Sequence, residues 1–213
     1  MFLESSPVTS WSGEIKRPQV HPTAFIHHTA VLIGDVRVGK NAIVCPGAVL
    51  RADEGTPIVI GEGVNIQDRV VMHCLKGGHI EVGEDCSIAH GAVIHGPCVL
   101  GREIFVGFNA VVHDARVGSG SFISHCALVT NVELAESTLV PAGRMVQDPG
   151  EAAGLPRTGQ AEMEFCGKVL EANEELRRGY KGMQHLEIHH HDGLHPHKPR
   201  IRRRGREEVA KEA

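Results

Sequence analysis

Histidine is the residue type that first suggests chemistry in this chain of 213 residues, which contains 15 of them. Three lie in two short apolar blocks, Val-Val-Met-His73 and Ile-Ala-His90-Gly-Ala-Val-Ile-His95. Three imidazoles that leave one coordination position open are typical of catalytic zinc, whereas structural zinc sites are closed by four ligands and rich in cysteine. Such a metal lowers the pKa of bound water to about 7. The three histidines are therefore candidates for a site that supplies hydroxide at neutral pH.

A repeat of six residues must position these histidines. Large aliphatic residues recur at this interval, often followed by glycine and, four positions later, by alanine or cysteine. The aliphatic residues are Val20, Ile26, Leu32, Val38, Val44, Leu50, Ile60, Ile66, Met72, Val82, Ile88, Ile94, Leu100, Val106 and Val112, then, one residue early, Val117, Ile123 and Val129. A period of six matches neither helical spacing nor one long strand. It predicts short strands joined by corners, with the aliphatic and small side chains inside.

Two intervals in the series hold ten residues, from Leu50 to Ile60 and from Met72 to Val82, and each indicates a loop of four extra residues at a corner. The pattern resembles the hexapeptide-repeat family of left-handed parallel β-helices, whose triangular coils contain three repeats, about 18 residues, each. We therefore expect an all-β fold, a left-handed parallel β-helix over residues 20–146. This winding is an exception to the right-handed crossover preference.

Outside the repeat the sequence changes character. Residues 1–19 are expected to form an N-terminal extension and residues 147–160 a linker. Apolar residues at intervals of three and four, from Phe165 to Met183, predict a C-terminal α-helix over residues 161–184. Residues 185–213, rich in His and Arg, are expected to form a disordered tail.

Composition excludes several classes of protein. The chain is 41% hydrophobic but only 4% aromatic, with 25 glycines, which suits a narrow regular fold better than a helical bundle. A net charge of −4 gives no reason to expect nucleic acid. No basic-apolar leader and no apolar run long enough for a spanning helix are visible, so we expect neither a secretory signal nor a membrane partner. Six irregularly spaced cysteines are typical of reduced thiols, so we expect a cytoplasmic protein.

Counting in coils places the candidate side chains. His73 and His95 are 22 residues apart, one coil of about 18 plus the four inserted residues. They therefore occupy the same position on adjacent coils, about 4.8 Å apart along the axis. By the same count Arg51 lies one coil below His73, and His113 lies one coil above His95. We expect one column of four side chains, with His113 at an interface.

His90 stands on a different face, because it belongs to the repeat before His95. Asp68 lies one coil beneath it. If three prisms pack around a threefold axis, His73 and His95 of one chain face His90 of the next. One coil lower, Arg51 faces Asp68. The count therefore predicts a homotrimer with a metal and an ion pair at each interface.

Three blocks resemble the γ-class carbonic anhydrases: Arg51-Ala-Asp-Glu-Gly-Thr-Pro, Asn65-Ile-Gln-Asp-Arg-Val-Val-Met-His73 and Ile88-Ala-His90-Gly-Ala-Val-Ile-His95-Gly-Pro. The resemblance covers residues 20–146 and, more weakly, Gly179-Tyr180-Lys181. It implies a homotrimer with one divalent metal per interface, zinc or else iron or cobalt. His73 and His95 of one subunit and His90 of the next would bind it. The implied reaction is the reversible hydration of CO₂ to bicarbonate and a proton by hydroxide on that metal.

The resemblance also implies roles for six other residues. Gln67 would hydrogen-bond the hydroxide, with Asn65 supporting Gln67. Glu54 would assist proton movement or product exchange in the same pocket, and Tyr180 would reach the edge of the site from the helix. The ion pair between subunits would be formed by Arg51 and Asp68.

One segment departs from the resemblance. The best-studied branch of the family carries a long acidic loop after the first metal histidine, including a proton-shuttle glutamate. Here the segment His73-Cys-Leu-Lys76-Gly-Gly is short, with lysine where that glutamate would fall. Proton export must then use another group or the buffer.

Two other functions remain open. A hexapeptide acyltransferase shares the prism and the threefold symmetry, but it uses one histidine as general base with acyl-CoA in the cleft between subunits and needs no metal. A non-catalytic scaffold or assembly subunit would bind metal without hydrating CO₂. Metal analysis distinguishes the acyltransferase from a carbonic anhydrase, because only the latter needs a metal. A CO₂ hydration assay distinguishes the scaffold subunit, which would bind metal without catalysing hydration.

Overall fold

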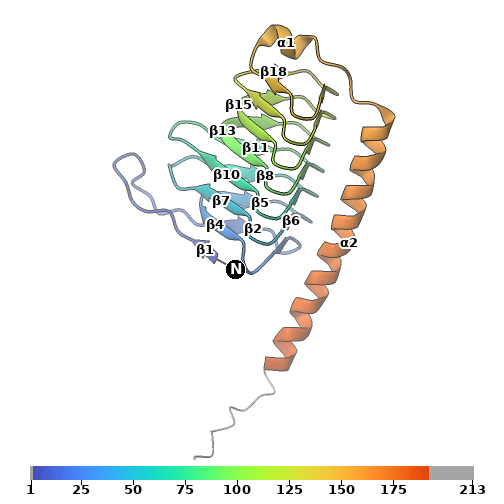
Figure 1. Cartoon of the computed structure of the whole chain (residues 1–213). Helices are drawn as coiled ribbons and strands as arrows, with labels where there is room; N and C mark the ends of the chain where they lie inside the picture. Colours follow the sequence, from blue (N-terminus) through green and yellow to red (C-terminus); the bar gives the residue numbers. More distant parts are fainter. Residues whose placement is uncertain (1, 192–213) are drawn as a thin grey trace, which may run out of the picture.

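The computed structural model describes residues 2–191, with residues 184–191 described only as part of a helix. The predicted tail from residue 192 onward lies outside the described residues. Figure 1 shows short strands stacked coil upon coil into a prism, with one long helix beside it. The predicted left-handed parallel β-helix with a C-terminal α-helix is confirmed.

The strands form three faces of the prism. The histidine face, named for its outward side chains, consists of β1 (Phe2–Glu4), β4 (Val31–Gly34), β7 (Val49–Ala52), β10 (Val71–Cys74), the first halves of β13 (Val93–Leu100) and β15 (Val111–Val117), β17 (Leu128–Thr130) and β20 (Met145–Val146). The helix face consists of β3 (Phe25–Ile26), β6 (Ile43–Val44), β9 (Asn65–Ile66), β12 (Ser87–Ile88), β14 (Phe105–Val106), β16 (Phe122–Ile123) and β19 (Leu139–Val140). The third face consists of β2 (Gln19–Val20), β5 (Val36–Val38), β8 (Ile58–Ile60), β11 (Ile80–Val82), the second halves of β13 and β15, and β18 (Glu133–Leu134).

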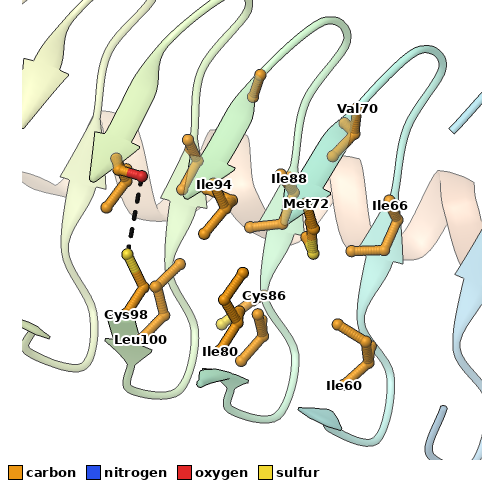
Figure 2. Close-up of a cluster of buried hydrophobic side chains, with 14 of the residues drawn as sticks. Ile60, Ile66, Val70, Met72, Ile80, Cys86, Ile88, Ile94, Cys98 and Leu100 are labelled. Atoms are coloured by element: carbon orange, nitrogen blue, oxygen red, sulfur yellow. Dashed lines mark hydrogen bonds between the residues drawn. The ribbon is translucent and has the colours of Figure 1, made fainter. Parts of the chain in front are cut away.

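The aliphatic residues of the repeat fill the interior of the prism. Met72, Ile88 and Ile94 are fully buried, and Figure 2 shows their side chains meeting across the interior. Burial of one such side chain contributes roughly 1.5–3 kcal/mol. Cys86 and Cys98 occupy small inward positions, where burial raises the pKa of Cys86 to about 12 and that of Cys98 to about 11. These two thiols therefore belong to the core and are unreactive at neutral pH.

Strand pairing follows the count of repeats. The two ten-residue intervals form loops at corners, between β7 and β8 and between β10 and β11. His95 pairs with His113, 18 positions later, but Cys98 pairs with Ala115, only 17 positions later. This shift accommodates the interval of five residues, instead of six, between Val112 and Val117. The coils above it therefore stay in register with those below.

The helix α2 (Gln160–His191) covers the helix face, where it contacts β3, β6 and β12. Phe165 packs its ring against Phe105 and Phe122, with ring centroids 5.3 and 6.2 Å away. At the other end, the buried Arg177 donates a hydrogen bond of 2.6 Å to the Thr23 carbonyl. Aromatic packing and this anchor together fix the helix along the prism.

One boundary drawn from the sequence is wrong, and one segment contains a helix that the sequence did not predict. The C-terminal helix continues to His191 instead of ending at residue 184, because no glycine or proline interrupts residues 184–191. The segment predicted as a linker contains a short helix, α1 (Pro149–Ala153). Asp148 caps it by accepting hydrogen bonds from the Gly150 and Glu151 N–H groups.

The N-terminal extension is partly built into the prism. Its strand β1 pairs in parallel with β4, placing Glu4 beside Ile33. Among the described helices, none is both long and apolar enough to cross a membrane.

Candidate metal centre

His73 and His95 lie side by side on adjacent coils of the histidine face. They are paired residues of β10 and β13, and their ring centroids are 5.3 Å apart. Arg51 is the partner of His73 in the coil below, and His113 is the partner of His95 in the coil above. The predicted column of four side chains is confirmed.

These two imidazoles carry nitrogen atoms that nothing in the described chain satisfies. His73 Nε2 and His95 Nδ1 are buried and have no hydrogen-bond partner among the described residues. His73 Nε2 lies 3.2 Å from Glu54 Oε1, but the orientation does not make a hydrogen bond. Burial lowers the pKa of His73, and the charge of Arg51 lowers it further, against an opposing effect of Glu54. A neutral imidazole with an unshared lone pair is the form that binds a metal, so this pair fits a divalent ion.

The two corner loops hold one another beside the pair. Glu54 accepts a hydrogen bond of 3.0 Å from the Lys76 N–H, which joins the loop after β7 to the loop after β10. Asp53 binds Arg51 through both carboxylate oxygens, each at 3.1 Å. Asp53 was not among the predicted site residues, although it lies in the Arg-Ala-Asp-Glu block that drew attention to its neighbours. The loops thus bring two carboxylates to within 4 Å of His73.

His90 lies on the other side of a corner, two residues after the end of β12. Its Nδ1 is 2.8 Å from Asp68 Oδ2, and the side chain is half exposed. A carboxylate on one ring nitrogen orients an imidazole and leaves the other nitrogen free as a ligand. Within one chain Asp68 therefore contacts His90, while Arg51 contacts Asp53. The ion pair of Arg51 with Asp68 of another subunit stays a prediction.

Gln67 and Asn65 belong to the half of the site that contains His90. Asn65 Nδ2 donates to Ser87 Oγ at 2.6 Å, and Gln67 Nε2 donates to Asn65 Oδ1 at 3.0 Å. This chain of amides orients Gln67, whose Oε1 is buried without a partner among the described residues. Gln67 therefore presents a fixed acceptor beside His90. Glu54, by contrast, lies beside His73.

Two small cavities flank His90 between α2 and the helix face. One, of about 240 Å³, is lined by Asp68 and Tyr180, and the other, of about 260 Å³, by Phe108 and Phe165. Tyr180 stacks on the ring of Phe25, with centroids 4.9 Å apart. The helix therefore brings Tyr180 to the edge of a cavity that also contains His90 and Gln67.

Asn173 on α2 lines both cavities, and sequence reasoning did not select it. Its Nδ2 donates to the Val169 carbonyl of the same helix. Only the docking of the helix reveals its place, because helical periodicity alone does not show which turn meets which coil.

The two halves of the site do not meet within one chain. Among residues 2–183, whose side chains the structure describes, no three His, Cys, Asp or Glu side chains are grouped closely enough to hold a metal ion. The histidine face presents His73, His95 and Glu54, whereas the corner beyond it presents His90 with Gln67. Each half is ordered by its own hydrogen bonds.

An outward stripe of aliphatic side chains runs beside the histidine column. Strand pairing stacks them coil upon coil, and Val71 and Met145 are among the exposed large apolar residues. The stripe consists of Val31, Val49, Val71, Val93, Val111, Leu128 and Met145. Sequence reasoning missed it, although its signal is visible: an apolar residue directly precedes the inward aliphatic where a polar one would suit solvent.

Comparison with known proteins gives the family. No family model matches the chain. The carbonic anhydrase of Methanosarcina thermophila is 33% identical over 200 residues, covering 84% of this chain and 81% of that protein. A solved hexapeptide transferase family protein from Anaplasma phagocytophilum matches with a TM-score of 0.69 and 33% identity, over 84% of this chain and 98% of that one. The chain belongs to the hexapeptide-repeat β-helix family.

Some relatives are much longer than this chain. The carboxysome assembly protein CcmM of Nostoc sp. is 39% identical over 186 residues, which cover 83% of this chain but 34% of that protein. CcmM of Synechocystis sp. is matched over 25% of its length. The chain thus spans only about a quarter to a third of the length of these two relatives. A putative acetyltransferase of Bacillus cereus, 22% identical with a TM-score of 0.71, shares the fold.

Proposed function

We propose that this chain is a subunit of a homotrimeric γ-class carbonic anhydrase. It would act in the cytoplasm on CO₂ and bicarbonate, with one divalent metal, zinc in the first instance, at each subunit interface. The observation that carries the proposal is the pair of buried, unsatisfied imidazole nitrogens on His73 and His95.

The third ligand would come from a neighbouring copy. His90 keeps one ring nitrogen beside Asp68 and the other free, at a corner that one chain cannot bring to His73. Three imidazoles with an open position suit a catalytic metal. When bound, such a metal lowers the pKa of water and so supplies hydroxide near neutral pH.

The residues around the site would orient the reactants and move the proton. Oxygen from water adds to the carbon of CO₂, and one proton must leave for each bicarbonate formed. Gln67 Oε1 is a fixed acceptor that can orient a water molecule beside His90. Glu54, held by the Lys76 N–H, faces His73 and can take up the released proton. Tyr180 bounds the cavity on the helix side.

The relatives favour different functions for this fold. A protein named carbonic anhydrase aligns with most of this chain and most of its own length. The longer relatives are named assembly proteins, which favours a scaffold role as the second candidate. The hexapeptide transferase at 33% identity keeps acyl transfer as the third.

One set of measurements on the purified full chain separates these functions. The protein is loaded with zinc and, anaerobically, with iron(II), and its mass in solution, metal content and CO₂ hydration rate by stopped flow are measured. We expect a trimer with about one metal per subunit and hydration that depends on the metal.

The His90→Ala variant is the control. It should lose metal and hydration together while the prism stays folded, because His90 lies at an exposed corner. Full metal occupancy in this variant would refute the ligand assignment. In the wild-type chain, bound metal without CO₂ hydration would favour the scaffold function. A trimer that contains no metal, and that in a separate assay binds acetyl-CoA and transfers its acetyl group, would favour acyl transfer.

A further inference from the structure

Two columns of side chains continue above the candidate metal centre, towards the C-terminal coils. On the histidine face the column runs through His95, His113 and Thr130. At the corner of the helix face it runs through His90, Phe108 and His125. In the corner column the rings of Phe108 and His125 stack with centroids 4.2 Å apart, and the His90 ring lies tilted against Phe108 with centroids 5.3 Å apart.

The proposed metal site fixes how these columns meet between subunits. Both rise by the same strand spacing, about 4.8 Å per coil. Copies around a threefold axis are related by rotation without translation. His90 of one subunit is placed level with the gap between the two ligands of the next, the upper one being His95. Two coils above His90, His125 is then level with the gap between His113 and Thr130.

The hydrogen bonds within the chain prepare these two histidines for each other. The Phe108 N–H donates to His125 Nδ1 at 3.0 Å, so a neutral His125 carries its proton on Nε2. His113 Nδ1 lies 3.1 Å from Thr130 Oγ1. If His113 donates its proton there, its Nε2 keeps a lone pair. One ring thus offers a donor and the other an acceptor.

We propose that His125 Nε2 of one subunit donates a hydrogen bond to His113 Nε2 of the next, and that this contact holds His95 in place. His113 lies against His95, with ring centroids 5.3 Å apart. His113 and His125 are therefore positioning residues that act on the site through this ring. The proposal rests on the proposed function, since the metal sets the height at which the subunits meet.

The surroundings of these residues favour a second copy of this chain as the occupant. Phe108, between the two histidines of its column, leaves 39% of its surface exposed. The aliphatic stripe runs along the facing column and offers an apolar surface at the same levels. Exposed aromatic and aliphatic side chains interleaved with imidazoles suit a buried interface better than solvent.

The test compares two substitutions at one position in the zinc-loaded full chain. His125→Phe keeps a flat ring on Phe108 but has no donor, whereas His125→Gln places an amide nitrogen near the position of Nε2. Release of zinc to a colorimetric chelator and dissociation of the trimer on dilution are measured. We expect roughly tenfold faster release for His125→Phe, as for a buried acceptor left unpaired, and near wild-type behaviour for His125→Gln.

A cycle with His113→Phe shows whether the two residues act together. On that background His125→Phe should have no further effect, because the acceptor is already absent. His79→Phe, at an exposed position of another corner, controls for the loss of an imidazole as such. The contact is refuted if His125→Phe releases zinc as slowly as wild type, if Phe and Gln act alike, or if the effects add. A wild-type chain without trimer or metal would instead refute the proposed function, and this contact with it.

Discussion

The histidine face and the helix face of this prism are built alike but finished differently. Both turn apolar side chains outward: an aliphatic stripe on one, and the stacked rings of Phe105 and Phe122 on the other. The helix face is covered by α2 of the same chain, whereas no described element covers the histidine face (Figure 1).

The difference shows how the site is divided. The helix face is covered by folding, and in its half of the site the amides of Gln67 and Asn65 are joined by hydrogen bonds, although Gln67 Oε1 has no partner among the described residues. The histidine face keeps unsatisfied nitrogens on His73 and His95. An outward apolar stripe beside unsatisfied polar atoms is what an interface presents before its partner binds. Folding thus covers one face, and under the proposed function assembly would cover the other.

The strongest test of this difference between the faces is to mix two inactive variants, each of which keeps one half of the site intact. His73→Ala and His90→Ala chains should each lack metal and hydration activity. Mixed and refolded together at equal amounts, they should regain about a quarter of the wild-type sites, since a random trimer pairs intact halves at that frequency. Metal content and stopped-flow hydration measure the recovery.

The matched control mixes His73→Ala with His95→Ala. Both lesions lie on the same half, so no interface in this mixture contains three intact ligands, and no activity should return. Recovery in the control, or none in the first mixture, would show that the halves are not shared between chains.

A second pair of substitutions separates assembly from folding. Leu128→Lys, in the aliphatic stripe, should weaken the trimer by roughly a hundredfold or more, because a lysine would be buried there without a partner. Its free energy of unfolding as a monomer should change by about 0.5 kcal/mol or less.

Phe105→Ala, on the helix face, should do the reverse. Phe105 is buried, stacks on Phe122 and meets the Phe165 ring edge to face, so its loss should lower the unfolding free energy by about 3–5 kcal/mol. Sedimentation and urea denaturation of both variants give the two quantities. Equal effects of the two substitutions on folding would remove the distinction between the faces.

The smallest effect concerns the charge around His73 in the metal-free protein. Burial lowers the pKa of His73, Arg51 lowers it further, and Glu54 opposes them. Arg51→Gln should therefore raise that pKa towards its ordinary value, and Glu54→Gln should lower it further. NMR titration of the ring protons measures both shifts, and two shifts of the same sign would contradict this arrangement of charges.

Much of this molecule could be predicted from the chain of residues. The repeat of aliphatic and small residues predicts the coils, and counting 18 residues plus an insertion predicts that Arg51, His73 and His95 share a column. The separation of His90 from that column also follows from counting. These predictions work because a β-helix repeats one local geometry, so position along the chain converts directly into position in space.

What the pattern did not predict depends on contacts between distant segments. Three such contacts join residues that are not related by the six-residue repeat. They are the pairing of β1 with β4, the position of Asn173 beside His90, and the hydrogen bond from Arg177 to the Thr23 carbonyl. The end of α2 was also misplaced, because the change in composition at residue 185 does not stop a helix.

The sequence by itself determined the coil, its register and the height of the repeat's side chains along the prism, because each depends only on a local repeat. The tertiary structure decided which face the chain covers for itself, because the docking of α2 depends on how its aromatic and charged side chains fit coils far away in sequence. That choice left the histidine face uncovered, and with it the two imidazole nitrogens without a partner in the described chain.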